Sequence, residues 1–267
     1  MPYVYRYENG AFTQFEKPVV REQPLTITVN GVELATFLCT PVKLDYLVIG
    51  FLCFEGIIRG LDDIIALDVD TDYGVASVEL ATALVQPKKR VFTSGCGMGL
   101  TFSIGASHYP PLLSDLSLAP DDVFPLMRQL FDGADMYRAS RGIHAAALSD
   151  GDRILLLAED VGRHNALDKI LGEALTLGIP TQGCILLTTG RISSEMLRKG
   201  AHMGTPFLIS RTSPTTLSIE AAKRLGVTAI GYVRRNSFNV YTHPERLLHQ
   251  PSAAAVMEAQ AVAVSGD

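Results

Sequence analysis

Cysteine is scarce in this sequence and never occurs in a paired motif. The 267 residues contain four cysteines, at positions 39, 53, 96 and 184, and no two of them form a CxxC pair. The spacing argues against a zinc ribbon and gives no support to an internal disulfide relay. Cys39, Cys53 and Cys184 lie in apolar runs, so we expect them to pack in the core as small hydrophobic residues.

The sequence also lacks an excess of positive charge and a long apolar segment. Its formal net charge is −5 and it has no basic tail, so nucleic acid and an anionic membrane are poor candidate partners. The longest apolar run, Leu44–Ile58, is interrupted by Asp45 and Glu55 and is too short to span a bilayer. The first residues contain no apolar stretch typical of a secretory signal, and we expect a cytoplasmic protein.

Hydrophobic residues make up 47 % of the chain and charged residues 19 %, as in ordinary globular proteins. The length suits one large domain or two ordinary ones. We expect a β-rich domain over residues 1–110, a second domain over residues 118–250 and a tail over residues 251–267, because the stretch 107–120 is rich in proline and resembles a linker.

In the first half, alternating apolar residues on both sides of Asn30-Gly31 predict a β-hairpin with a type I′ turn. Thr40-Pro41 predicts the start of a helix, with threonine as the N-cap and proline in the first turn. Two further strands are expected at 64–69 and 75–80. Residues 1–22 have no clear pattern beyond an extended edge segment.

The second half alternates between apolar strands and amphipathic helices, which predicts an α/β layer with largely parallel strands. Polar segments follow four of the expected strands, at 159–165, 188–191, 210–213 and 234–237. Ligands bind beyond the carboxyl ends of the strands in such sheets. Arginines and helix N-termini at that edge favour a polyanionic ligand, because both groups bind phosphate.

The segment 93–102 places three glycines around Cys96. Glycines can turn backbone N–H groups inward, and a thiol held there has the surroundings that lower its pKa and make it a nucleophile. The alternative is a glycine-rich turn without chemistry. A Cys/His hydrolase that pairs Cys96 with His144 or His164 is also open, although His144 lies in an apolar strand typical of a core histidine.

Five stretches of the chain are similar to the signature of the FdhD family, the accessory sulfurtransferases of formate dehydrogenase. The resemblance also covers 41–58 and the Cys96 segment, and it therefore extends over nearly the whole chain. The five stretches are EDVGRHNALDK at 159–169, GIHAAAL at 142–148, GRISSEM at 190–196, SRTSPTTL at 210–217 and NVYTHPER at 239–246.

The resemblance implies a fold and a task. It implies a mainly β N-terminal domain, a C-terminal cytidine-deaminase-like α/β/α layer and a homodimer, without deamination, because the HxE…PCxxC zinc signature is absent. It implies sulfur transfer from an IscS-type cysteine desulfurase, through a persulfide, to the molybdenum (or tungsten) bis-pterin guanine dinucleotide cofactor of formate dehydrogenase. No metal ligands and no zinc are implied. The implied cofactor-binding residues are Tyr232, Val233, Arg234, Arg235, Asn236 and Ser237.

The chain departs from the family at one position of the Cys96 segment. The family reads GCGxCG, whereas this chain reads GCGMG, so that Cys96 matches the persulfide-bearing cysteine and Gly99 stands at the second cysteine. A second thiol cannot release the sulfur within this segment, and we expect the sulfur to leave to the metal or to an external reductant. A non-enzymatic cofactor chaperone is therefore the alternative to a sulfurtransferase.

Overall fold

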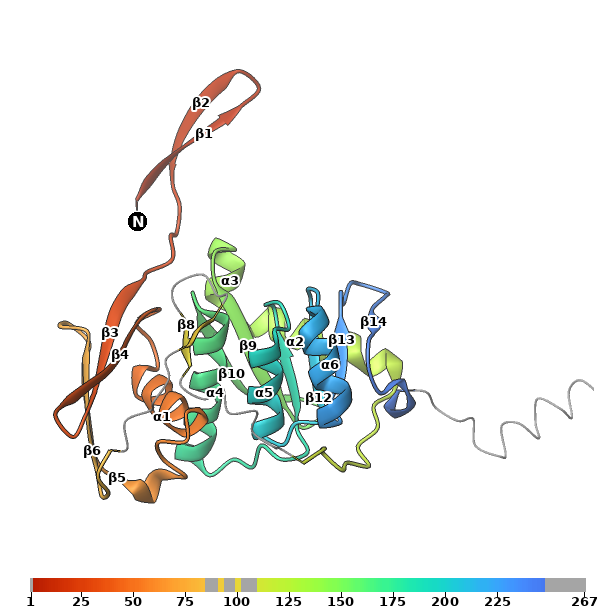
Figure 1. Cartoon of the computed structure of the whole chain (residues 1–267). Helices are drawn as coiled ribbons and strands as arrows, with labels where there is room; N and C mark the ends of the chain where they lie inside the picture. The colour runs from red at the N-terminus through yellow and green to blue at the C-terminus, as the bar shows by residue number, and fades with distance from the viewer. Residues whose placement is uncertain (1, 85–90, 94–98, 102–109, 248–267) are drawn as a thin grey trace, which may run out of the picture.

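The computed structural model describes residues 2–84, 91–93, 99–101 and 110–247 (Figure 1). Within these residues the protein has a four-stranded sheet, a six-stranded sheet and two small hairpins. Helices α1 (Leu44–Phe54) and α4 (Arg163–Leu177) lie between the two large sheets and pack against each other. The mixed α/β class predicted from the sequence is therefore confirmed.

The first hairpin projects from the body as an arm (Figure 1). Its strands, β1 (Tyr3–Glu8) and β2 (Ala11–Glu16), are antiparallel and are joined at Asn9 and Gly10, whose φ angles are 52° and 84°. Positive φ at both positions is the type I′ geometry that Asn-Gly favours. The sequence analysis expected an extended edge segment here and did not predict the turn, although the Asn-Gly pair was a readable signal.

The four-stranded sheet has the order β4-β3-β6-β5. Its hairpin turns at Asn30 and Gly31, both with positive φ, as predicted. Every second side chain of β3 is fully buried and faces α1, and Phe37 of β4 stacks edge-on against Phe51 of α1 at 4.8 Å. The strands are β3 (Gln23–Val29), β4 (Val32–Cys39), β5 (Ile64–Asp70) and β6 (Val75–Leu80).

Helix α1 begins at Leu44, and the prediction of a start at Thr40-Pro41 was wrong. The backbone N–H of Thr40 donates to Asp160 Oδ2 at 3.0 Å, and its hydroxyl oxygen accepts from the Val161 N–H at 3.1 Å. These contacts with the second half of the chain take up the groups that an N-cap would use, and they delay the helix by one turn.

Two glycines let α1 and α4 approach at backbone distance. A Cβ atom on Gly50 would lie 1.8 Å from the carbonyl oxygen of Asp168, and one on Gly172 would lie 1.9 Å from that of Tyr46. No side chain larger than hydrogen fits at either position. The contact joins the N-terminal sheet to the rest of the molecule, and one hydrophobic cluster extends through both parts.

The six-stranded sheet has the order β10-β9-β11-β12-β13-β14. Strands β11, β12 and β13 are mutually parallel, whereas β9 is antiparallel to both of its neighbours, so that β10 runs in the same direction as β11. The strands are β9 (His144–Ser149), β10 (Ile154–Asp160), β11 (Ile185–Thr188), β12 (Phe207–Ser210), β13 (Thr228–Gly231) and β14 (Asn239–Val240).

Helices cover both faces of this sheet. Alternate residues of β9 belong to two separate cores: Ala145 and Ala147 pack with α2, and Ala146 and Leu148 pack with α4. A single helix was predicted over 121–136, but the chain breaks at Ala134. The remaining helices are α2 (Val123–Gly133), α3 (Asp135–Ser140), α5 (Ser194–His202) and α6 (Thr216–Leu225).

In the described part of the chain, no helix has the length and apolarity to cross a bilayer. Short elements connect the parts described above. The short elements are η1 (Leu61–Asp63), β7 (Val91–Thr93), β8 (Gly99–Thr101), η2 (Pro120–Asp122) and η3 (Pro244–Arg246). The resemblance of the second half to cytidine deaminase and the domain boundaries stay predictions, and the tail over 251–267 lies outside the described residues.

Candidate functional site

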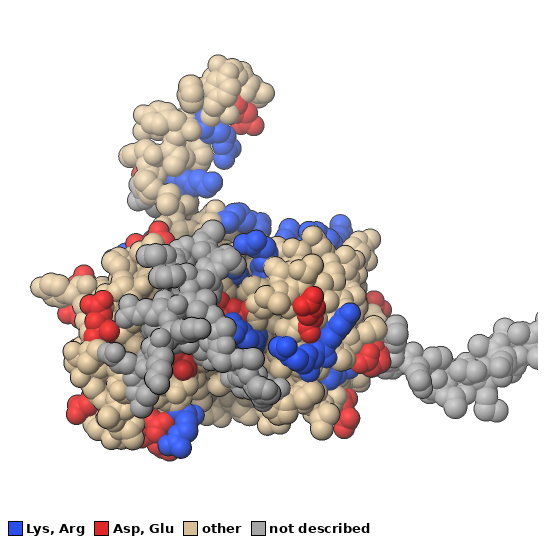
Figure 2. Space-filling view, viewed as in Figure 1, with Lys and Arg blue, Asp and Glu red and all other residues tan. Residues whose placement is uncertain are grey.

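The carboxyl ends of β10, β11, β12 and β13 lie along one edge of the six-stranded sheet, which we call the carboxyl edge. The N-termini of α4, α5 and α6 follow three of these ends. The convergence of the four polar segments, predicted from the alternation of strands and helices, is therefore confirmed. Lys and Arg side chains gather along this upper edge of the body (Figure 2).

Hydrogen bonds tie the turns at this edge to one another. The Gly190 N–H donates to Thr188 Oγ1 at 3.0 Å, and the Ser210 hydroxyl donates to the Gly190 carbonyl at 2.6 Å. The Thr212 N–H in turn donates to Ser210 Oγ at 3.0 Å. Buried hydroxyls thus hold the backbone after β11 and β12 in one arrangement. This arrangement fixes the backbone positions of Arg191 and Arg211.

A fully buried ion pair connects the edge to the first half of the chain. Lys169 Nζ donates to Asp160 Oδ2 at 2.6 Å and to the carbonyl oxygens of Thr40 and Glu159 at 3.0 and 3.2 Å. Both side chains have no exposed surface. The three ammonium protons each have an acceptor, which a buried charge requires. Because it is enclosed, this pair holds the structure together and is not available to a ligand.

The other Asp160 oxygen is also fully used. Its Oδ1 accepts from the Gly162 N–H at 2.8 Å and from Asn165 Nδ2 at 2.9 Å. Glu159 accepts from the backbone N–H groups of Met136 and Tyr137, at the start of α3. The carboxylates of Asp160 and Glu159 therefore have structural roles, and we consider Arg163 and His164 as the candidates for chemistry in the stretch 159–169.

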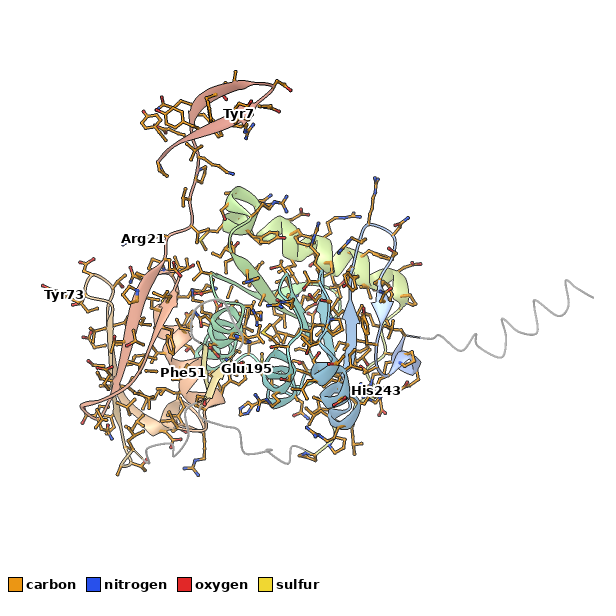
Figure 3. The ribbon with its side chains drawn as sticks, turned by 45° about the horizontal axis from the view of Figure 1, so that its top comes forward. Tyr7, Arg21, Phe51, Tyr73, Glu195 and His243 are labelled. Atoms are coloured by element: carbon orange, nitrogen blue, oxygen red, sulfur yellow. The ribbon has the colours of Figure 1, made fainter. Side chains whose placement is uncertain are left out.

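His164 lies in the first turn of α4, because the helix begins at Arg163 and not at Ala166 as predicted. Its Nε2 atom is 3.3 Å from Ser193 Oγ and 3.4 Å from Glu195 Oε2. Burial, together with Lys199 and Arg163, holds the pKa of His164 well below its usual range. The ring is therefore neutral at pH 7. Glu195, which lies within the body of the molecule (Figure 3), is close enough to His164 to act as an orienting carboxylate.

A second buried ion pair lies next to this histidine and had no signal in the sequence. Lys199 of α5 pairs with Asp168 of α4, and its Nζ atom also lies 4.8 Å from the centre of the Phe54 ring. Burial opposes the charge on Lys199, but the carboxylates of Asp168 and Glu195 raise its pKa. The i,i+4 spacing of Glu195 and Lys199 could have suggested a shared helix face, but not the partner on α4.

His144 stands at the start of β9, at the same edge, and is half-buried. A Cβ atom on Gly190 would lie 3.0 Å from Arg163 Cβ and 3.3 Å from His144 Nδ1, so the two side chains border one glycine. Burial and the nearby Arg163 lower the pKa of His144. Of the two histidines, His164 has the carboxylate within reach that nucleophilic chemistry would need.

The predicted cofactor segment forms the turn between β13 and β14. The Arg234 N–H donates to the Ser237 carbonyl at 2.8 Å, and the Tyr232 N–H donates to the Thr212 carbonyl at 3.1 Å. Tyr232 takes a left-handed φ of 53°, and its side chain is 42 % exposed. The turn is thus fixed to the end of β12 with its arginines in solvent. Cofactor binding by residues 232–237 stays a prediction.

Comparisons with known proteins decide the family. A family model described as the FdhD/NarQ family matches residues 20–248. The chain belongs to this family. It is 40 % identical over 254 residues to the sulfur carrier protein FdhD of Bacillus subtilis, covering 91 % of this chain and 95 % of that protein. It is 41 % identical over 250 residues to the protein of the same name from Staphylococcus haemolyticus, with coverage of 91 % and 95 %.

A crystal structure agrees with this assignment. The protein from Desulfotalea psychrophila, assigned as a formate dehydrogenase accessory protein, has a TM-score of 0.74 and 29 % sequence identity to this chain. The match covers 92 % of this chain and 98 % of the other. The FdhD/NarQ fold therefore extends over both large sheets.

Three of the four cysteines of this FdhD/NarQ member are buried. Burial raises the pKa of Cys39 to about 12 and that of Cys53 to about 11, and it also raises the pKa of Cys184. These thiols stay protonated near neutral pH, as expected for core residues. Cys96, the predicted catalytic residue, lies outside the described residues, between β7 and β8, which pair as a hairpin.

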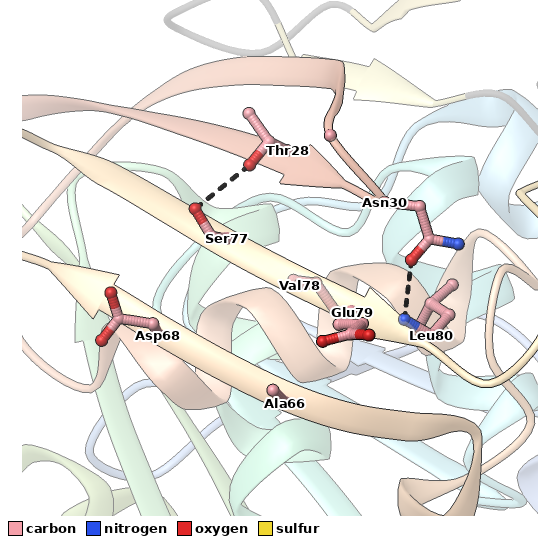
Figure 4. A pocket seen from close by; sticks show the side chains of 9 residues that line it. Thr28, Asn30, Ala66, Asp68, Ser77, Val78, Glu79 and Leu80 are labelled. Atoms are coloured by element: carbon pink, nitrogen blue, oxygen red, sulfur yellow. Dashed lines mark hydrogen bonds between the residues drawn. The ribbon is translucent and has the colours of Figure 1, made fainter.

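A shallow depression of about 750 Å³ lies on the outer face of the four-stranded sheet (Figure 4). Thr28, Ser77 and the carboxylates of Asp68 and Glu79 line it, and the four strands contain no lysine or arginine. Within the described residues, the strands offer an anionic ligand carboxylates and no basic side chain to offset them. The carboxyl edge, with its arginines, is the electrostatically suitable surface for phosphate groups.

Proposed function

We propose that this protein is a sulfur carrier for the maturation of formate dehydrogenase. Cys96 accepts sulfur from a cysteine desulfurase as a persulfide and passes it to the molybdenum (or tungsten) bis-pterin guanine dinucleotide, which is the cargo. Formate dehydrogenase then receives the sulfurated cofactor. Family membership and the relatives named sulfur carrier protein FdhD support this role. The carrier acts as a homodimer, as the family resemblance implies.

The observation that carries the proposal is the state of the other cysteines. A sulfur carrier needs a thiolate that can attack a donor persulfide. Cys39, Cys53 and Cys184 are at most 8 % exposed and have raised pKa values. Since the sequence has four cysteines, Cys96 remains as the residue that can form the persulfide.

The transfer divides into two balanced steps. In the first step the Cys96 thiolate attacks the terminal sulfur of the donor persulfide, forms a new S–S bond and releases the donor thiolate. In the second step two external thiols reduce the Cys96 persulfide, which returns the Cys96 thiol and one disulfide and delivers one sulfide to the cargo. External thiols are needed because Gly99 stands where the family has its second cysteine.

The carboxyl edge suits the phosphates of the cargo. Arg191, Arg211, Arg234 and Arg235 lie along it, and in the described part of the chain no carboxylate forms an ion pair with any of them. A guanidinium group binds phosphate through parallel N–H donors. The outer face of the four-stranded sheet has the opposite charge, which favours the edge as the cargo site.

A persulfidation experiment tests the proposal. The purified protein is incubated with a cysteine desulfurase and cysteine, and its peptides are analysed by mass spectrometry without reductant. We expect one added sulfur atom on the Cys96 peptide, none in Cys96→Ser, and an unchanged adduct in the matched control Cys184→Ser. An unmodified Cys96 peptide, while the desulfurase itself carries a persulfide, would refute sulfur carriage.

That negative result would favour a cofactor chaperone that binds and delivers the cargo without carrying sulfur. The absence of a second loop cysteine at Gly99 is the observation in its favour. The two functions differ in a maturation assay, because a chaperone with Cys96→Ser still restores formate dehydrogenase activity to a deletion strain, whereas a sulfur carrier with this change does not.

A further inference from the structure

The arm formed by β1 and β2 has one side that is covered with exposed aromatic rings. The register of the hairpin places alternate residues of each strand on the same side, and Tyr7 lies directly opposite Phe12. The rings of these two residues are 5.0 Å apart. We call this side of the arm the aromatic face. Its rings belong to Tyr3, Tyr5, Tyr7 and Phe12, which are 64–70 % exposed.

The opposite side of the arm is covered by its own residues. The Arg6 guanidinium carbon lies 4.8 Å from the centre of the Phe15 ring, and Val4 and Phe15 are half-buried. A two-stranded hairpin on its own is marginally stable in water, and it gains stability when its apolar side packs on another surface. Within the described residues, neither hydrophobic cluster reaches the arm. In this part of a single chain, the aromatic face is therefore the side without a packing partner.

An apolar pocket of about 260 Å³ lies where the arm joins the body. We call it the root pocket. The linker after β2, the segment before α1, and α3 contribute to its wall, and the apolar lining includes Pro18, Val19, Pro41, Val42, Met136 and Ile143. Val19 and Val42 are 62 % and 40 % exposed, so the pocket is open to solvent. An apolar cavity of about 150 Å³ accepts benzene, and the root pocket therefore has room for one tyrosine or phenylalanine side chain.

The linker that forms one wall of the root pocket also fixes where the arm begins. Val20 lies against the body, since a Cβ atom on Gly142 would be 3.3 Å from Val20 Cγ2. From this wall the arm projects away from the body (Figure 1). An arm that folded back into the root pocket would pull its own linker, residues 18–21, out of the wall and open the pocket. A ring that fills the intact pocket therefore comes from a second molecule.

A second copy of this chain carries rings of the required size. Under a two-fold axis the same contact occurs twice, so each aromatic face covers the root pocket of the other copy. Arg21 lines the pocket, and in the described part of the chain no carboxylate forms an ion pair with it. Its guanidinium can stack on an incoming tyrosine ring. Figure 3 shows Tyr7 in the arm and Arg21 at its root. The chain thus holds both halves of one self-complementary contact.

The exposed rings offer enough area for a stable dimer. An aromatic side chain has about 150–250 Å² of surface. At 64–70 % exposure, each of the four rings therefore presents roughly 100–170 Å² to solvent. Two arms, together with the surfaces that they would cover, reach about 1,600 Å² or more, and stable specific interfaces bury about 1,200–2,000 Å². The area favours a second copy over a transient partner, for which smaller interfaces are typical.

We propose that two copies of the protein exchange their arms, with the aromatic face of each arm seated in the root pocket of the other copy. One tyrosine ring fills the pocket, and the neighbouring rings pack on the linker and on α3 around it. The exchange gives the homodimer of the proposed function a defined interface, and it does not depend on sulfur transfer.

Sedimentation equilibrium of the full-length protein tests the exchange. We expect a dimer whose dissociation constant rises about tenfold or more in Tyr5→Thr and in Tyr7→Thr, since each loses an interface ring and keeps a residue that favours strands. Ala139→Leu changes an exposed residue of α3 that lines the root pocket, and it should weaken the dimer similarly because its side chain occupies the pocket. The matched control is Tyr73→Thr, which removes a tyrosine that is 84 % exposed between β5 and β6, and we expect no change.

Mixing the two kinds of variant distinguishes arm exchange from pairing of arm with arm. In a mixed dimer of Tyr5→Thr with Ala139→Leu, one unchanged arm meets one unchanged root pocket, so the mixture should dimerise more tightly than either variant alone. Pairing of arm with arm predicts no such recovery. A monomeric full chain, an unchanged dissociation constant in Tyr5→Thr and Tyr7→Thr, or the absence of recovery on mixing would each overturn the proposal. Persulfide formation on Cys96 is measured independently, so failure of the arm exchange leaves the sulfur-carrier proposal standing.

Discussion

The structure lowers the pKa of three histidines, His144, His164 and His202, below the ordinary histidine value. Burial is the largest cause in each case, and neighbouring cations add to it: Arg163 beside His144, and Lys199 beside His164 and His202. Each ring is therefore neutral in the folded protein at a pH where the unfolded chain binds a proton. The folded state thus depends on unprotonated histidine.

The stability of the protein should therefore fall with falling pH below the ordinary histidine pKa of about 6.5. In that window the unfolded state binds more protons, so the free energy of unfolding decreases by up to about 1.4 kcal/mol per pH unit for each histidine. Urea unfolding at several pH values from about 7.5 to about 5.5 measures this slope. His164→Asn should make it shallower by about one proton, and a slope of zero in the unchanged protein would contradict the expectation.

At the residue scale, the sequence predicted which stretches hold the polar residues of the carboxyl edge. It did not predict which residues they contact. Asp160 and Lys169 stood out within a polar motif, yet they form a buried pair and not an open site. Their partner Thr40 lies 120 residues before Asp160, and no local pattern contains that information. The stacking of Arg211 on Phe131 was equally invisible, because it joins the end of a strand to a separate helix.

At the scale of elements, the contact between α1 and α4 depends on glycine. Gly172→Ala should destabilise the fold by roughly 3 kcal/mol or more, because its Cβ would meet the Tyr46 carbonyl at 1.9 Å and the helices would have to separate. Gly50→Ala should have a similar effect. Thermal and urea unfolding measure both losses.

Gly60→Ala is the matched control for these variants. A Cβ atom on Gly60 would have no neighbour within 4 Å among the described residues, and the φ of −176° is extended backbone that any residue adopts. We expect a change within about 0.5 kcal/mol. A small effect at Gly172 as well would mean that α1 and α4 can shift apart at little cost.

Elements with strong periodicity were predictable, and their ends were less so. The hairpin at Asn30-Gly31 and the strands of the six-stranded sheet follow from local pattern alone. The start of α1 did not, since Thr40 bonds to Asp160 and Val161 instead of capping the helix. Helix α4 begins before its apolar stripe, with Gly162 at the N-cap position and no side-chain cap hydrogen bond.

At the scale of the whole molecule, the arm formed by β1 and β2 stands apart from the core. Tyr3, Tyr5, Tyr7 and Phe12 are 64–70 % exposed, and neither hydrophobic cluster includes a residue of the arm. Removing residues 1–16 should leave the free energy of unfolding of the single chain within about 0.5 kcal/mol of that of the full chain, measured by urea unfolding at protein concentrations too low for dimers to form. A loss of several kcal/mol under these conditions would show that the arm packs on its own body.

The overall plan was partly predictable. Alternation of strands and helices predicted the parallel strands and the polar edge at their carboxyl ends, and the topology agrees. The insertion of antiparallel β9 between β10 and β11 was not predictable, because strand order depends on contacts across the sheet. The arm was missed although its Asn9-Gly10 turn was present in the sequence.

The separation of charge between the two sheets affects how a ligand approaches. The protein as a whole carries a net charge of −5 and repels an anion at long range, whereas the arginines of the carboxyl edge attract it nearby. At physiological ionic strength the Debye length is about 8 Å. An anion that comes within this distance of the edge is screened from the carboxylates on the outer face of the four-stranded sheet. Attraction of an anion to this edge is therefore short-range, and salt at physiological ionic strength shields the anion from the repulsive part of the surface.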